Sequence, residues 1–86
     1  MTDLQIFEDA LAEVCRLAES YPESRAIVSI IDQLRYVIDV ETGANFDRSL
    51  LVKINIGVLT AREIEDLDLG VAKKLYAVSA IIKSKN

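Results

Sequence analysis

The chain has 86 residues, of which 51% are hydrophobic and 28% charged, with a net charge of −4 and no histidine. It is too apolar for disorder and lacks the run of about twenty apolar residues that spans a bilayer, so we expect a soluble single domain over residues 1–86, without a membrane partner. The negative charge argues against a nucleic-acid partner, because that binding relies on Lys and Arg neutralising phosphates. A basic protein partner fits better.

The N-terminus and the single cysteine restrict compartment and chemistry. Residues Met1 to Ile6 lack a cationic segment followed by an apolar stretch, so no secretory signal is visible and we expect a cytoplasmic protein. Cys15 cannot form an internal disulfide, and without histidine there is neither a zinc-binding set nor a Cys/His nucleophile pair. We expect Cys15 to be a small buried hydrophobe.

Two helices are predicted in the first half of the chain. Apolar residues recur at alternating spacings of three and four from Asp3 to Ser20, and Thr2 or Asp3 can cap this helix. Pro22 disfavours helix before it and is accepted in the first turn of a new one, so the second helix is predicted from Pro22 to Glu41, with Gly43 as its left-handed terminator. Its stripe is wide enough for a central helix: Ile27, Ile30, Ile31, Leu34, Val37 and Ile38, extended by Val28, Tyr36 and Val40.

A third helix is predicted from Arg48 to about Glu65. Asp47 is the candidate N-cap, and Phe46 can form a hydrophobic staple with Leu51. Gly57 weakens the middle of a helix, so we expect close approach of another helix there, with a kink or a partner contact as alternatives. The predicted buried stripe is Leu50, Leu51, Ile54, Val58, Ala61 and Ile64.

The fourth helix is predicted from Leu69 to about Lys83. Asp68 can cap its start, and the last residues, Ser84 to Asn86, should fray. Four amphipathic helices of similar length joined by short turns predict an all-α fold, a compact antiparallel bundle of four helices.

Four carboxylates crowd the turn between the last two helices: Glu63, Glu65, Asp66 and Asp68. They are either an ordinary solvated turn or a patch that binds a partner. Enzyme activity is not expected, because acid and base chemistry needs a cleft that shifts pKa values and holds substrate. We therefore assign no catalytic residue, no metal site and no cofactor.

Tyr36 is the preferred aromatic anchor for a protein partner. It lies beside the main apolar stripe of the second helix, so a core aromatic with its hydroxyl at the surface is an equal alternative. An acidic surface around Glu63 to Asp68 would steer the chain toward a cationic pocket.

Several segments together resemble a known family. They are Tyr21-Pro22, Gln33-Leu34-Arg35-Tyr36-Val37, Phe46-Asp47-Arg48-Ser49-Leu50, Gly57 and Arg62-Glu63-Ile64-Glu65. In this order they resemble the small helical type VI secretion immunity proteins that neutralise NAD(P)-hydrolysing antibacterial effectors.

The resemblance implies a cytoplasmic antitoxin that binds the toxin domain of its cognate effector and blocks the active site. The partner would be a bacterial toxin domain, basic around its active site. The residues themselves, and not the resemblance, suggest Tyr36, Glu63, Glu65, Asp66 and Asp68 as its contacts. Leu69-Gly70 follows Asp68 where the family pattern has a proline, which puts contacts at this turn in doubt. The alternative is a generic helical adaptor or a homodimer that buries the extra apolar surface of the second helix.

Overall fold

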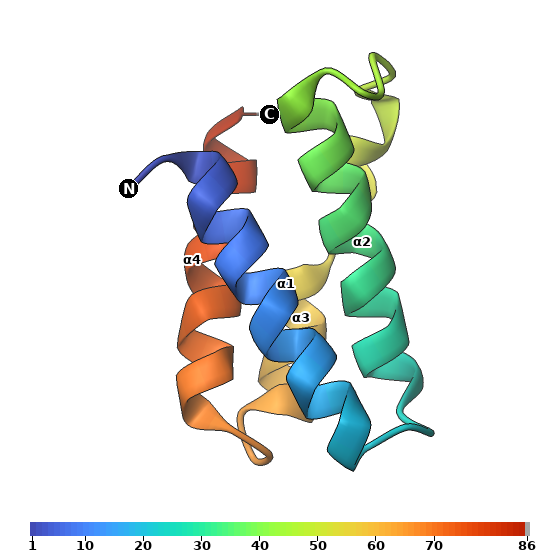
Figure 1. Ribbon diagram of the computed structural model, residues 1–86, viewed down its shortest axis with the longest axis vertical. Coiled ribbons are helices and arrows are strands. Elements are labelled where there is room, and N and C mark those ends of the chain that lie inside the picture. Colours follow the sequence, from blue (N-terminus) through green and yellow to red (C-terminus); the bar gives the residue numbers. More distant parts are fainter. Residues whose placement is uncertain (86) are drawn as a thin grey trace.

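The computed structural model describes residues 1–85, and these form an antiparallel all-α bundle with extents of 33 × 22 × 20 Å (Figure 1). Helix α1 packs against α2 and α4, and α4 also packs against the irregular third segment. The predicted fold class is confirmed. In chain order the elements are α1 (Asp3–Ser20), α2 (Arg25–Thr42), the 3₁₀-helix η1 (Ser49–Lys53), α3 (Ile56–Leu59), the π-helical turn η2 (Thr60–Ile64) and α4 (Leu69–Lys85).

Helix α1 has the predicted bounds, and its start is fixed by a capping box. The Thr2 hydroxyl accepts a hydrogen bond from the Gln5 backbone N–H at 3.2 Å, and the Thr2 backbone N–H donates to the Gln5 side chain at 2.8 Å. Two N–H groups that a helix start leaves without partners are thereby satisfied.

Helix α2 begins three residues later than predicted, so the start at Pro22 is wrong. Residues 21–24 form a turn in which the Ser24 N–H donates to the Tyr21 carbonyl. The Ser24 hydroxyl then accepts from the Ile27 N–H at 3.2 Å, which caps the helix. At the other end Gly43 has a φ of +84°, the left-handed conformation expected of this terminator.

The third segment is not one helix from Arg48 to Glu65, and this prediction is wrong. The backbone of Ile54 is extended, with φ −66° and ψ 125°, and it separates η1 from α3. The α3 helix then widens into η2, where the Glu65 N–H reaches back to the Thr60 carbonyl. Because the break changes the helical phase, Ile56 and Thr60 are buried instead of Val58 and Ala61.

Helix α4 starts as predicted and ends later. The Asp68 carboxylate accepts from the Val71 N–H at 3.1 Å, which is the expected cap. The helix includes Ser84 and Lys85, so these two residues do not fray, and Asn86 lies outside the described residues.

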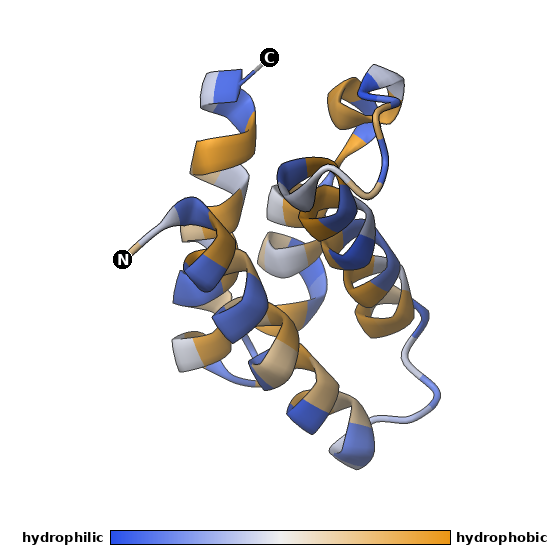
Figure 2. Ribbon diagram, turned by 45° about the horizontal axis from the view of Figure 1, so that its top comes forward, coloured by the Kyte–Doolittle hydropathy of each residue, from blue (hydrophilic) through white to orange (hydrophobic). Residues whose placement is uncertain are grey.

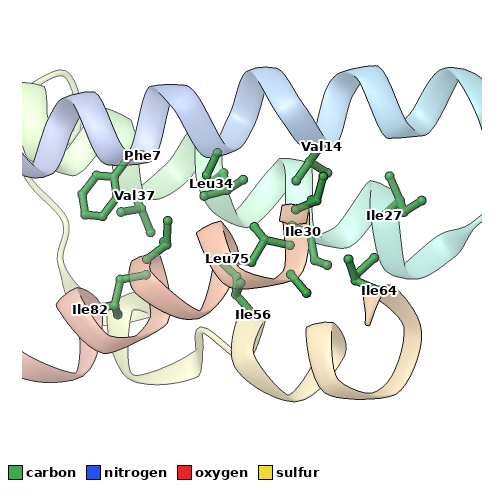
Figure 3. Close-up of a cluster of buried hydrophobic side chains, with 14 of the residues drawn as sticks. Phe7, Val14, Ile27, Ile30, Leu34, Val37, Ile56, Ile64, Leu75 and Ile82 are labelled. Atoms are coloured by element: carbon green, nitrogen blue, oxygen red, sulfur yellow. The ribbon is translucent and has the colours of Figure 1, made fainter. Parts of the chain in front are cut away.

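One hydrophobic cluster lies between the elements (Figure 3), and hydrophobic residues line one side of each long helix (Figure 2). Leu34, Leu75 and Ile56 are fully buried and come from α2, α4 and α3. The buried set is Phe7, Ala10, Val14, Leu17, Ile27, Ile30, Leu34, Val37, Leu51, Ile56, Ile64, Val71, Ala72, Leu75, Val78 and Ile82.

Gly57 lies where α3 crosses α4, which confirms the expected close approach. A Cβ at position 57 would lie 2.8 Å from the Ser79 hydroxyl oxygen and 3.5 Å from the Ser79 Cβ. Glycine therefore lets the short third segment reach the bundle.

Candidate protein-binding surfaces

The acidic turn divides into residues that hold the fold and residues that face solvent. Asp68 is half-buried, caps α4 and lies 3.7 Å from Arg16. Glu63, Glu65 and Asp66 are exposed. The structure thus brings the four predicted residues into one turn, but Asp68 already has a structural task.

One of the exposed carboxylates faces a tyrosine of α4. Burial, together with the neighbouring Glu65 carboxylate, raises the pKa of Tyr76 above its ordinary value. A phenol is already neutral at physiological pH, and the contact with Glu65 keeps its proton in place.

Two acidic residues of α1 form ion pairs, one with Lys74 of α4 and one with Arg16 of α1 itself. Lys74 Nζ lies 2.8 Å from Asp9, and Arg16 lies 2.7 Å from Glu13. A hydrogen bond and the charge of Glu13 raise the pKa of Arg16, and the hydrogen bond to Asp9 raises the pKa of Lys74. This face is one of exposed ion pairs, each of which contributes little to stability.

Tyr36 is half-buried, and its hydroxyl is already used. It donates to the backbone carbonyl of Asp47 at 2.7 Å, across the loop that follows α2. The ring packs against the core cluster and lines an open pocket. Tyr36 thus supports the loop, and its predicted role as a partner's anchor stays a prediction.

A second set of hydrogen bonds joins α2 to Asn55, at the other end of the stretch that begins at Asp47. The Gln33 side chain accepts from the Asn55 N–H at 2.9 Å and donates to the Asn55 side-chain oxygen at 2.7 Å. It also donates to Ser29 at 3.0 Å. The Asn55 N–H therefore bonds to α2 instead of to a preceding helical turn, which accounts for the break that the sequence pattern missed.

Asp47 fixes the start of η1. Its carboxylate accepts from the Ser49 N–H at 2.9 Å, and its own N–H donates to the Asn45 side chain at 2.9 Å. Hydrogen bonds from the Ser49 side chain and backbone lower the pKa of Asp47. The predicted N-cap at Asp47 is nevertheless wrong: the N-cap of η1 is Arg48, which makes no side-chain capping hydrogen bond, and Asp47 lies one residue earlier, where it holds the turn before η1.

Four apolar side chains in residues 46–58 are exposed to solvent. The exposed fractions are 90% for Phe46, 46% for Leu50, 72% for Val52 and 52% for Val58. The predicted staple between Phe46 and Leu51 is absent, since Phe46 is exposed while Leu51 is buried. We call Phe46, Leu50, Val52 and Val58 the apolar surface.

Two residues of the apolar surface, Leu50 and Val58, line two hollows that share Ile54. One is a pocket of about 300 Å³ between α2 and η1, which Leu50 lines together with Tyr36. The other, of about 450 Å³, lies between α3 and α4 and is lined by Val58. Sequence reasoning missed this surface because it placed Leu50 and Val58 in a continuous stripe. The available signal was that segment 46–58 has more apolar residues than one stripe can bury.

Other sites expected from the sequence can be placed. Cys15 is half-buried instead of fully buried. Among residues 1–85 no three His, Cys, Asp or Glu side chains group as metal ligands would, and no helix is long and apolar enough to cross a membrane.

Comparison with known proteins identifies the family. The sequence model of the Tsi6 family matches residues 2–84. The chain belongs to the Tsi6 family. This result confirms the resemblance to small helical type VI secretion immunity proteins that the sequence segments suggested.

Members of the Tsi6 family are similar in sequence and in structure. The immune protein Tsi6 of Pseudomonas aeruginosa is 28% identical over 75 residues, which cover 87% of this chain and 80% of the relative. The solved structure of Tsi6 from P. aeruginosa superposes with a TM-score of 0.87 at 26% identity, covering 95% of both chains. A structure of Tse6 in complex with Tsi6 matches with a TM-score of 0.90 at 25% identity, covering 99% of this chain and 90% of that chain.

Proposed function

We propose that this protein is an immunity protein that binds the toxin domain of a cognate secreted effector and blocks its active site. The observation that carries the proposal is the match over residues 2–84 to the Tsi6 family. The likeness to a structure of Tse6 in complex with Tsi6 supports it, because nearly the whole chain has the fold of that match.

In this proposal the protein acts by occupying a surface, without catalysis of its own, and it works in the cytoplasm. Helix caps and the hydrogen bonds that join α2 to the following loop set the shape of the described residues before a partner binds. A rigid surface binds with a smaller loss of conformational entropy. Which toxin it neutralises would follow from the neighbouring effector gene, and an NAD(P)-hydrolysing toxin is what the sequence resemblance implies.

We further propose that Glu63, Glu65 and Asp66 face a basic region around the toxin's active site. All three are exposed, and they follow one another at the end of the third segment. A cluster of like charges raises the rate of encounter with an oppositely charged partner. Asp68 contributes to this site through the turn that it holds.

The test is co-expression of the chain with the toxin domain encoded beside it, followed by titration of the two purified proteins. We expect rescue of growth, tight binding, and loss of the toxin's activity in proportion to the bound fraction. A Leu34→Asp variant, which puts a charge into the fully buried core, is the unfolded control. If neither rescue nor binding occurs with any neighbouring toxin, the proposal is wrong. A concentration-dependent mass would then favour the homodimer or adaptor.

A further inference from the structure

We propose that the apolar surface formed by Phe46, Leu50, Val52 and Val58 is the main docking site for the effector's toxin domain. The partner would present an apolar side chain to the pocket between α2 and η1, flanked by carboxylates. This inference rests on the proposed immunity function and assigns most of the binding energy to a surface other than the acidic turn.

The first argument is that the protein fixes residues 47–55 while leaving Leu50 and Val52 exposed; Phe46 lies one residue before this stretch and Val58 three residues after it. Tyr36 holds the chain at Asp47, and Gln33 holds it at Asn55. Between Asp47 and Asn55 only Leu51 is buried, with 5% of its surface exposed. A segment whose conformation is already set loses little entropy when a partner binds.

The second argument is the exposure itself. Phe46 and Val52 are 90% and 72% exposed, although burying such side chains stabilises a folded protein. Soluble proteins rarely expose apolar groups together without a binding role. Large side chains that become buried at the centre of an interface dominate the binding energy, and Phe46 is the largest exposed apolar side chain of the segment.

The third argument concerns charge and identifies the chemistry of the partner. Residues 46–62 contain the cations Arg48, Lys53 and Arg62 and one carboxylate, Asp47, which accepts the Ser49 N–H. Within residues 1–85 no carboxylate lies within 4.0 Å of these three cations, and the same holds for Arg25, Arg35, Lys73 and Lys83, whereas Arg16, Lys74 and Lys85 are paired. This segment is basic in a chain of net charge −4, so it favours a partner region that carries carboxylates.

Asp32 lines the pocket together with Lys53, but the two form no ion pair within 4.0 Å. A carboxylate of the partner can therefore approach Lys53 without first breaking an internal contact. The toxin domain would need such an acidic-flanked apolar region in addition to the basic region proposed for the acidic turn.

The apolar surface and the acidic turn can be tested separately. In Figure 1 η1 lies near the C-terminal end of α2, whereas the turn before α4 lies at the opposite end of the bundle. Val58 lies in α3, directly before η2, so Phe46→Ala and Lys53→Glu are the variants that separate the two surfaces. Buried apolar contacts slow dissociation, while charges that remain at the rim speed association. Variants at the apolar surface should therefore raise the dissociation rate.

The experiment compares matched variants by calorimetric titration and stopped-flow kinetics with the purified toxin domain. Val58→Ser is paired with Val28→Ser, because each valine is 52% exposed. Lys53→Glu is paired with Lys73→Glu, since both lysines are exposed and the charge change is equal. Phe46→Ala is the single change of largest expected effect.

We expect Phe46→Ala and Val58→Ser each to raise Kd at least about tenfold through faster dissociation. Lys53→Glu should also weaken binding, and both control variants should bind as the wild type does. Circular dichroism establishes that each variant is folded.

If the wild type binds the toxin domain and each variant changes the Kd as much as its control does, this inference is wrong and the proposed function stands. Failure of the wild type to bind would instead remove the proposed function as well. A third outcome also overturns it: the wild type forms a dimer that Phe46→Ala dissociates, while toxin affinity is unchanged. The surface would then be covered by a second copy of the chain.

Discussion

The side chain of Gln33 provides α2 with a fixed contact to the third segment. Its amide exchanges two hydrogen bonds with Asn55, one to the backbone N–H and one to the side chain. Backbone N–H groups in a helix normally bond to a carbonyl four residues earlier. By taking the Asn55 N–H, Gln33 ends one helical piece and lets the next begin in a different phase.

Protonation of the Asp47 carboxylate tests how the loop after α2 is held. Ser49 lowers its pKa through two hydrogen bonds, so the ionised form is favoured in the folded protein. A lowered folded-state pKa gives stabilisation that is present above the unfolded-state pKa and is lost as the pH falls through the folded-state value. The loop should therefore loosen only in acid.

We predict that Ser49→Ala raises the pKa of Asp47 toward its ordinary value. The side-chain hydrogen bond, which is the larger cause of the lowering, is removed, while the backbone N–H still donates. An NMR titration of the Asp47 side chain measures the change. Ser84→Ala is the control, because the Ser84 hydroxyl bonds to the Ile81 carbonyl within α4 and not to Asp47. An unchanged midpoint in Ser49→Ala would contradict the assigned cause.

Among elements, α3 and α4 approach each other closely at one glycine. Gly57 faces Ser79 so closely that an added Cβ would meet the serine oxygen at 2.8 Å. Alanine in the interior of a helix is more stabilising than glycine by about 1 kcal/mol, so Gly57 is unfavourable by helix propensity alone. The serine hydroxyl, rather than the α4 backbone, is the group that a larger residue would displace.

A double-mutant cycle tests this contact. In the Ser79→Ala background, Gly57→Ala should stabilise the protein by up to about 1 kcal/mol, because the new Cβ then meets only a methyl group at ordinary distance. In the wild-type background the gain should be smaller or reversed. Urea denaturation of the four proteins gives the free energies of unfolding. The same effect in both backgrounds would show that Ser79 does not restrict position 57.

At the scale of the whole molecule, charge is unevenly distributed. Two of the four lysines of α4 pair with acids of α1 and α2: Lys74 with Asp9, and Lys85 with Asp3 and Glu41. The acidic turn and the basic segment before it are left to face solvent. A partner therefore meets a surface with two charged regions and an apolar part.

We predict that reversing Glu63, Glu65 and Asp66 to lysine slows association with the toxin domain by about tenfold at low salt, with the fold intact. The difference should shrink as salt screens the charges. Stopped-flow mixing at several ionic strengths measures the rate. The same reversals at Glu8, Glu19 and Glu23, which change net charge equally, should slow it less. Equal rates for the two triple variants would remove the acidic turn from the proposed site.

The sequence by itself determined the helices that depend on local chemistry. Caps at Thr2 and Asp68, the left-handed Gly43 and the apolar periods of α1, α2 and α4 all follow from neighbouring residues, and the structure confirms them. It also placed Glu63, Glu65 and Asp66 outside the core, where they are exposed, although their role in binding stays a prediction.

Only the tertiary structure decided the shape of segment 46–58. Its conformation depends on Gln33, which lies 22 residues from Asn55 in the chain, and on Tyr36, which lies 11 residues from Asp47. Helical periodicity within the segment carries no information about such links, so it placed Leu50 and Val58 inside. The polar contacts from α2 instead turn these residues outward, because they break the helix at Ile54 and change the face that meets the core.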